Sequence, residues 1–178
     1  MRTRAFNPKA RRGFTLIETA LATIIVGTGV LAVVTAYQAF HIQNRWASQA
    51  AVGQRLGNEI RELTLRFPKQ DPVTGIAVWG PEADETGVAD YDDLDDFDGF
   101  QFSAEDGTGP INAMGEVITE MPGWSQSVIV QYIDPFEITE VMPDRSTDLV
   151  RVRVTVRFKG PTDPAPVEVT SVSWIAPG

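Results

Sequence analysis

Aspartates are concentrated near the middle of the chain, in the segment Tyr91-Asp-Asp-Leu-Asp-Asp-Phe-Asp-Gly99. Five of them fall within the eight residues from Asp92 to Gly99, namely Asp92, Asp93, Asp95, Asp96 and Asp98. Carboxylate oxygens at this density are the hard ligands that calcium prefers. The segment is therefore the first candidate for cation chemistry.

The spacing of the segment excludes an EF-hand. A loop ending on Asp98-Gly99 and Glu105 would place Leu94 at the first ligand position, where an oxygen ligand is required. Two interpretations remain. One is an irregular calcium loop formed by the five aspartates, and the other is a solvated acidic turn with Phe97 directed inward. Neither requires a cofactor.

Glu18 is the second residue of chemical interest. It is the only charged residue among the 23 residues from Phe14 to Ala36. A carboxylate within a bilayer costs on the order of 2–3 kcal/mol and usually has a partner. If the chain were cut after Gly13, a neighbouring copy of the same helix could present the new amine of Phe14 to Glu18. Burial in lipid would strengthen such a pair.

The apolar segment from 14 to 36 predicts a membrane-spanning helix of roughly 35 Å. Five basic residues precede it and the next charge is Arg45, which predicts a cytoplasmic amino terminus. A secretory signal peptide cleaved near Val34-Thr35-Ala36 is one alternative, although its apolar region would be unusually long. A plain signal anchor is another, and it leaves Glu18 unexplained.

Residues 9–20, Lys-Ala-Arg-Arg-Gly-Phe-Thr-Leu-Ile-Glu-Thr-Ala, resemble the cleavage and methylation motif of type IV prepilins and type II secretion pseudopilins. The resemblance implies that prepilin peptidase cuts between Gly13 and Phe14 and methylates the amine of Phe14. It also makes Glu18 the carboxylate used in assembly. The absence of proline from residues 14–66 and of cysteine from the chain points to a minor pilin or pseudopilin.

This resemblance implies a location and a set of partners. The protein would sit in the bacterial inner membrane with its amino terminus cytoplasmic, and would then enter a filament in the periplasm or at the cell surface. Its partners would be prepilin peptidase, other pilins and the inner-membrane assembly platform. The alternative is a membrane-anchored extracytoplasmic binding domain, with calcium as one candidate ligand, that does not polymerise.

Composition argues against other classes of function. There is no cysteine, His41 is the only histidine, and no nucleophile motif is present, so we do not expect an enzyme. The first 13 residues hold five of the 15 basic residues and no acid, which leaves 10 basic and 24 acidic residues in the remainder. Such an acidic chain repels phosphate backbones, so we expect no direct binding of nucleic acid.

The elements that position these residues follow from periodicity. Apolar residues spaced three and four apart continue the helix through 37–67, and Pro68 predicts its end near Arg66. This stripe consists of Val52, Leu56, Ile60, Leu63 and Phe67. Strict alternation of apolar and polar residues from Leu149 to Lys159 predicts a strand. Strand composition at 125–133 and 167–175 predicts two more.

The predicted fold class is α+β and type IV pilin-like, with a long amino-terminal helix packed on a carboxy-terminal antiparallel sheet. The predicted organisation is a leader at 1–13, a membrane and assembly helix at 14–36, its amphipathic continuation at 37–67, an irregular acidic connection at 68–123, and the sheet of the globular head at 124–178. The arginines that alternate with the valines of 149–159 are expected to pair with acids across strands or between subunits.

Overall fold

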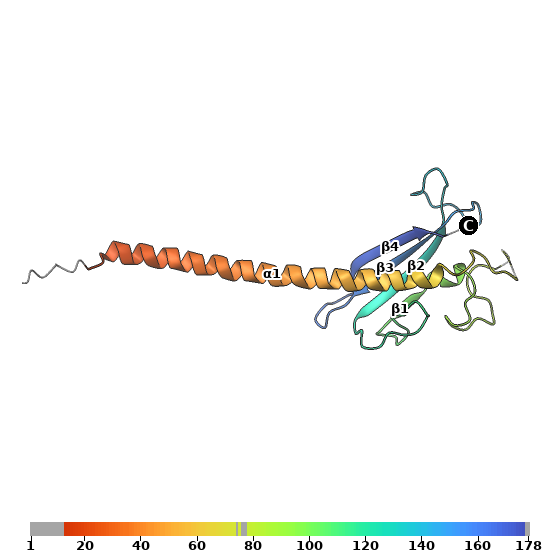
Figure 1. Cartoon of the computed structure of the whole chain (residues 1–178), viewed down its shortest axis with the longest axis horizontal. Helices are drawn as coiled ribbons and strands as arrows, with labels where there is room; N and C mark the ends of the chain where they lie inside the picture. The colour runs from red at the N-terminus through yellow and green to blue at the C-terminus, as the bar shows by residue number, and fades with distance from the viewer. Residues whose placement is uncertain (1–12, 74, 76–77, 177–178) are drawn as a thin grey trace, which may run out of the picture. The chain divides into compact units, whose positions relative to one another are not determined.

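The computed structural model describes residues 13–73, 75 and 78–176, so residues 1–12 of the predicted leader lie outside it. The chain divides into two compact units, the first ending at Trp46 and the second beginning at Ala47. The elements in chain order are α1 (Leu16–Thr64), the 3-10 helix η1 (Asp95–Phe97), β1 (Gln101–Ser103), β2 (Trp124–Tyr132), β3 (Val150–Phe158) and β4 (Val167–Ile175) (Figure 1).

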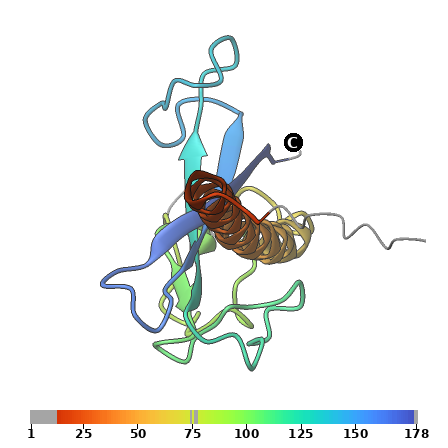
Figure 2. The same ribbon diagram turned by 90° about the vertical axis from the view of Figure 1, so that its left-hand side faces the viewer.

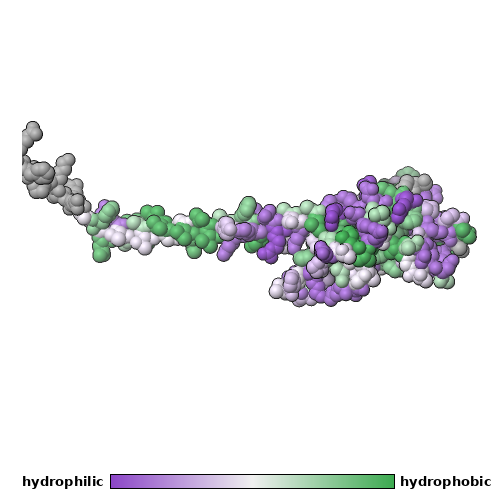
Figure 3. All heavy atoms as spheres, turned by 60° about the horizontal axis from the view of Figure 1, so that its bottom comes forward, coloured by the Kyte–Doolittle hydropathy of each residue, from purple (hydrophilic) through white to green (hydrophobic). Residues whose placement is uncertain are grey.

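Helix α1 runs without a break through the predicted membrane segment and its continuation. It begins and ends within two residues of the predicted bounds, Phe14 and Arg66. In the first unit the large apolar side chains point outward all around the helix, and Figure 3 shows this part mainly green and white. The helix is long and apolar enough to cross a membrane, and it is therefore a candidate membrane anchor.

In the second unit, the last turns of α1 pack across one face of the sheet (Figures 1 and 2). Leu56 and Ile60 are fully buried and Leu63 is 1 % exposed, whereas Val52 and Phe67 lie partly buried at the margin of the core. The predicted stripe is therefore the face that α1 buries. The α+β class, with one long helix packed on an antiparallel sheet, is confirmed.

Two glycines allow α1 to approach the sheet closely. A Cβ atom at Gly57 would lie 2.5 Å from Cγ2 of Val172 in β4. At Gly53, one turn earlier, it would lie 3.0 Å from Cγ2 of Thr170 and 3.1 Å from Cγ1 of Val169. Gly53 and Gly57 lie on the same face of the helix because they are four residues apart. Glycine at both positions lets the helix axis lie nearer to β4 than a larger residue would permit.

The sheet is an antiparallel meander in the order β1-β2-β3-β4. Its valine-rich inner face covers the helix: Val152, Val154 and Val156 of β3 are fully buried. Strands β2 and β3 lie within one residue of their predicted bounds, and β4 has the bounds that its composition predicts. A register shift between Val156 and Arg157 interrupts the pairing of β3 with β4.

A buried amide ties three parts of the head together. Gln126 of β2 is fully buried, and its side-chain nitrogen donates to the carbonyls of Leu56 at 2.8 Å and Ile111 at 3.1 Å. Its side-chain oxygen accepts from the backbone N–H of Ile111 at 2.8 Å. Buried polar groups are tolerated when they are paired in this way, and the network fixes the connection to both helix and sheet.

The outer face of β3 carries the arginine row. Arg157 donates to the hydroxyl of Ser127 at 3.0 Å, and Arg151 donates to the carbonyl of Ile138 and to the side-chain oxygen of Gln131. Within the described part of the chain, Arg151, Arg153 and Arg157 form no ion pair. Cross-strand pairing with acids is therefore not observed among these described residues: Arg151 and Arg157 donate to neutral acceptors, although Glu168 of β4 lies opposite Arg157 in the register. Pairing between subunits stays a prediction.

Candidate functional site

The start of α1 contains the residues of the predicted processing motif. Gly13, Phe14 and Thr15 precede the helix and are not part of any helix or strand. The Glu18 carboxylate accepts from the backbone N–H and the hydroxyl of Thr15, each at 2.9 Å, and the Thr15 hydroxyl accepts from the backbone N–H of Glu18 at 3.3 Å. This reciprocal arrangement is a capping box with Thr15 at the N-cap and Glu18 at the third helical position.

The capping box gives Glu18 a second role that sequence reasoning missed. The signal was present in Thr15-Leu16-Ile17-Glu18, which fits the capping-box pattern directly before an apolar run. One carboxylate oxygen is satisfied locally, and Glu18 remains exposed at the surface of the single chain. The peptide bond between Gly13 and Phe14 lies outside the helix.

Two apolar side chains, those of Leu94 and Phe97, anchor the acidic segment in the hydrophobic core. Leu94 is 1 % exposed and Phe97 is fully buried, three residues apart across η1. Side chains at this spacing in a 3-10 helix lie on one face. The ring of Phe97 contacts Phe67 and Tyr91 with centroids 5.6 Å and 5.1 Å apart. Phe97 is thus directed inward, as one of the two interpretations of the segment expected.

The segment is nevertheless not a solvated turn, because the anchor pulls three aspartates below the surface. Asp93, Asp95 and Asp96 are only 2 %, 4 % and 0 % exposed. Asp93 accepts from the backbone N–H groups of Asp95 at 2.8 Å and Asp96 at 3.3 Å. Oδ2 of Asp96 accepts from those of Asp92 at 3.0 Å and Asp93 at 3.1 Å. The buried carboxylates organise the turn.

The five predicted ligands do not all come together. Oxygens of Asp92, Asp93 and Asp96 lie within 4.8 Å of one another. Asp98 instead accepts from the indole N–H of Trp79 at 3.2 Å and from the backbone N–H of Val130 at 2.8 Å. Asp95 accepts from the backbone N–H of Gly80 at 3.3 Å. Asp98 and Asp95 therefore hold the loop in place, and Asp96 is the residue common to the acidic groupings.

Two glutamates join the cluster from the preceding loop. Oxygens of Glu82, Glu85 and Asp96 also lie within 4.8 Å of one another. Glu85 accepts from the backbone N–H of Glu82 at 2.9 Å, which folds this loop back on itself. Sequence reasoning missed both glutamates, since they lie in an irregular region without periodicity and only tertiary structure brings them to Asp96.

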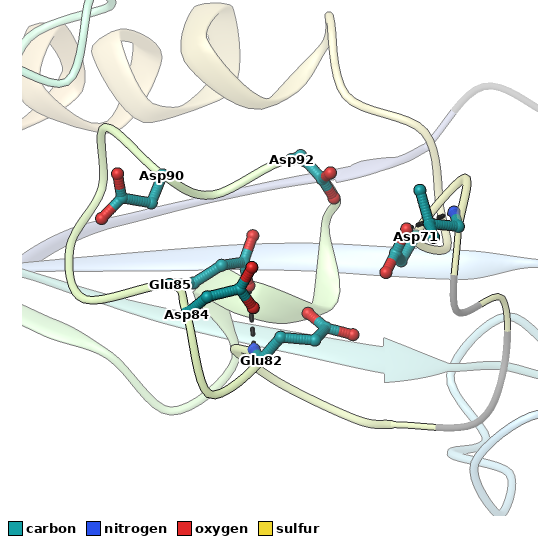
Figure 4. Close-up of a pocket in the computed structure, with 7 residues that line it drawn as sticks. Asp71, Glu82, Asp84, Glu85, Asp90 and Asp92 are labelled. Atoms are coloured by element: carbon teal, nitrogen blue, oxygen red, sulfur yellow. Dashed lines mark hydrogen bonds between the residues drawn. The ribbon is translucent and has the colours of Figure 1, made fainter.

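An acidic cavity of about 350 Å³ opens beside these residues (Figure 4). Its carboxylates come from three separate stretches of the connection, and none of the described residues that line it is an arginine or a lysine. The lining residues are Asp71, Val73, Glu82, Asp84, Glu85, Asp90 and Asp92. Such a concentration of like charge is favourable only if protons, solvent or a cation reduce the repulsion.

Asp96 shows most clearly how burial of a side chain opposes the ionisation of its carboxyl group. Its Oδ1 is buried, and its carboxyl group shares a side-chain hydrogen bond with Glu85. Burial raises the pKa of Asp96, as does the charge of Asp93, against the opposing effect of its backbone hydrogen bonds. Burial likewise raises the pKa of Glu85 to about 7, with a contribution from the Asp96 charge. Burial and contact with Asp95 raise the pKa of Asp93 to about 8.

Comparison with known proteins gives no assignment for either site. No protein-family model matches the sequence, and neither the curated proteins nor the solved structures yield a significant match.

Proposed function

We propose that this protein is a minor pilin or pseudopilin, a structural subunit of a type IV pilus or type II secretion filament. It is cleaved after Gly13 by prepilin peptidase, methylated on Phe14, and assembled through the amino-terminal part of α1. The observation that carries the proposal is the combination of the Arg-Arg-Gly-Phe junction with Glu18 at the start of a helix whose apolar side chains are exposed all round.

The surroundings of Gly13 support a processing role. Among the described residues, nothing lies within 4 Å of the position that a Cβ atom there would occupy. Packing with the described residues therefore gives no reason for a glycine at this position. A peptidase that binds the extended chain around Gly13-Phe14 would supply the reason, because a side chain there would meet the wall of its active site.

The exposed apolar surface of the first unit supports assembly in two environments. Large side chains such as Leu16, Val30 and Leu31 are 91 %, 59 % and 70 % exposed. A helix that is apolar on all sides requires lipid or other helices around it. A subunit that leaves the bilayer for a filament exchanges the first environment for the second. In both, Glu18 needs a counter-charge, and the amine of Phe14 on a neighbouring subunit provides one.

Mass spectrometry of the mature protein from its host membrane tests the processing step. We expect a terminal peptide that begins at Phe14 with a methylated amine, and accumulation of the full-length precursor in Gly13→Leu. Gly29→Leu is the matched control, since it places the same side chain in the same segment and should leave cleavage intact. A mature terminus near Tyr37 would instead show an ordinary signal peptide and overturn the proposal.

One observation favours a second candidate function. The buried acidic cluster suits a membrane-anchored extracytoplasmic domain that binds a cation without polymerising. Cleavage separates the two candidates, because a simple anchor retains residues 1–13.

A further inference from the structure

We propose that the outer face of the sheet, at Arg153, binds the connection between β2 and β3 of a second copy of this chain. The part of the connection that docks is residues 134–144, which we call the acidic tip. As a contact between neighbouring subunits the inference rests on the proposed function, although it requires no cleavage after Gly13.

The four strands are the basic part of an acidic head. Beyond residue 13 the chain holds 10 basic and 24 acidic residues, and only Arg45 and Glu18 among them belong to the first unit. The strands oppose this excess of acid, because they contain three arginines and a single acid, Glu168. The arginines alternate with the buried valines of β3 and therefore lie on the outer face. This face is the one on which the head attracts an anionic partner.

Arg153 is the arginine of this row that is open to a partner. It is exposed, and it makes neither a hydrogen bond nor an ion pair with any described residue. Ile129 of β2 and Ser173 of β4 lie on either side of it in the strand register, and neither is charged. Arg151 is half-buried, and burial together with the charge of Arg153 lowers its pKa. An anionic group bound beside Arg153 would reduce this repulsion.

The acidic tip supplies such a group on an ordered loop. It contains four acids and no base. Oδ1 of Asp134 accepts from the backbone N–H groups of Phe136 at 2.6 Å and Glu137 at 3.0 Å. The backbone N–H of Asp134 donates to the carbonyl of Glu140 at 3.1 Å, which closes the loop. The tip extends beyond the ends of β2 and β3 (Figures 1 and 2), so a neighbouring head can reach it.

The tip also exposes an apolar surface that the head itself does not cover. Phe136 is 98 % exposed, and Ile138 and Val141 are 54 % and 50 % exposed. Apolar side chains gathered in this way and surrounded by acids mark a surface that binds another protein. On the outer face, Ile129 is 40 % exposed beside Arg153 and offers apolar area. A guanidinium group can also stack on an aromatic ring, which suits Arg153 and Phe136.

The charges decide how two copies can meet. Two acidic tips repel each other, and so do two arginine rows, whereas a tip and an outer face attract. The contact therefore joins different surfaces of the two copies. Contacts of this kind can continue from subunit to subunit, as a filament requires. Arg151 shows that the two surfaces are compatible, since it donates to the carbonyl of Ile138 in the tip of its own chain at 2.9 Å.

Disulfide crosslinking tests the contact, because the chain has no cysteine of its own. Full-length Thr139→Cys, which labels the tip, and full-length Ser173→Cys, which lies beside Arg153, are reconstituted together in lipid vesicles and oxidised. We expect a mixed dimer in severalfold higher yield than from Ala83→Cys with Ser173→Cys. Ala83 is exposed on the other acidic surface of the head, so this control pair tests docking by that surface. Equal yields from the two pairs would overturn the proposal.

Exchange of charges shows whether the two surfaces attract each other. Arg153→Glu in the Ser173→Cys chain and Glu140→Arg in the Thr139→Cys chain should each lower the yield severalfold, and together they should restore it. Arg61→Glu, at an exposed arginine of α1, is the control and should leave the yield unchanged. Raising the salt from about 0.1 M to about 1 M should lower the yield, since the Debye length falls from about 10 Å to about 3 Å.

Three further results would overturn the contact: an unchanged yield in Arg153→Glu, no recovery in the exchanged pair, or a yield that rises with salt. Phe136→Ser provides a second variant, in which the apolar contribution is lost while every charge is kept, and its yield should also fall. The vesicles contain the full-length chain, so failure of the contact leaves processing at Gly13 to be decided by the mature terminus alone.

Discussion

Asp96 shows at the scale of one residue how an anchor can impose burial on a charge. Its neighbour Phe97 is fully buried, and Asp96 directly precedes it in the short helix η1, so the Asp96 side chain is buried as well. Two backbone hydrogen bonds stabilise its Oδ2, and its carboxyl group shares a side-chain hydrogen bond with Glu85. Glu85 and Asp93 face the same environment, in which burial and neighbouring charge raise the pKa of both carboxyl groups.

These raised pKa values predict an unusual pH dependence of stability. The folded chain retains protons on Glu85 and Asp93 up to pKa values of about 7 and about 8, whereas the unfolded chain loses them near pH 4. The folded state therefore binds more protons, and the free energy of unfolding falls as pH rises between about 4 and about 8. Thermal melts in EGTA across this range should show a declining melting temperature.

The same melts provide their own control. The Asp93→Asn variant should have a flatter profile, because it lacks one of the carboxyl groups whose pKa burial raises, in this case to about 8. A melting temperature in EGTA that is constant or rising across this window would contradict the assignment of buried, protonated acids.

The composition of the acidic segment predicts cation chemistry, but it does not predict which carboxylates are buried and which ones hold the loop. Five aspartates were equivalent in sequence, and their roles differ because Leu94 and Phe97 set which side chains face inward. Glu82 and Glu85 could not be found in the same way. Their approach to Asp96 depends on the path of an irregular connection, and no local periodicity encodes that path.

At the scale of elements, the periodic segments were predictable and their mutual packing was not. Alternation along β3 and the helical stripe of α1 are local patterns, so they appear in the sequence directly. The contact of Gly53 and Gly57 with β4 joins positions more than a hundred residues apart in the chain, and it depends on tertiary placement. In a sequence, a helical glycine reads only as a weak point of the helix.

The close approach at Gly57 predicts that a side chain there destabilises the head. In Gly57→Leu the new Cβ would lie 2.5 Å from Cγ2 of Val172, a stiff β-branched side chain, so α1 or β4 must shift. Overpacking of this kind costs about 1–3 kcal/mol. The melting temperature of the head, measured by near-ultraviolet circular dichroism in detergent, should fall by several degrees.

Two variants make the result at Gly57 specific. Gly27→Leu adds the same side chain to α1 at a position with no described neighbour within 4 Å, and it should leave the melting of the head unchanged. Adding Val172→Ala to Gly57→Leu should recover part of the loss by making room. An unchanged or higher melting temperature in Gly57→Leu would show that the helix does not depend on this contact.

At the scale of the whole molecule, the chain combines segments with opposite requirements for solvent. Five basic residues and no acid stand before residue 14, and the remainder carries 10 basic and 24 acidic residues. The helix between the basic start and the acidic head exposes an apolar surface over its first unit. Lipid and neighbouring helices satisfy such a surface, while the charged ends oppose its free transfer across the bilayer.

Glu18 is the charged residue within the apolar segment, and its two roles, as a helix cap and as the partner of a buried amine, can be separated. As a cap it needs only an acceptor, and a glutamine at the third helical position also completes a capping box. As the partner of a buried amine it needs its charge. Glu18→Gln therefore removes the ion pair and keeps the cap. Thr15→Ala removes the hydroxyl of the cap, at about 1 kcal/mol, and keeps the charge.

We expect the charge, rather than the cap, to decide assembly. Both variants should reach the membrane and be cleaved normally, because removal of a charge favours insertion and the Gly13-Phe14 bond is unchanged. Deleting one partner of a buried ion pair costs roughly 3–5 kcal/mol, which lowers association at least a hundredfold. Crosslinks to neighbouring pilins, scored together with cleavage in the same cells, should therefore nearly disappear in Glu18→Gln and persist in Thr15→Ala. Wild-type crosslinking in Glu18→Gln would overturn the pairing of Glu18 with Phe14. Loss of crosslinks in both variants would assign the defect to the start of the helix, and the carboxylate would then act in assembly as a cap.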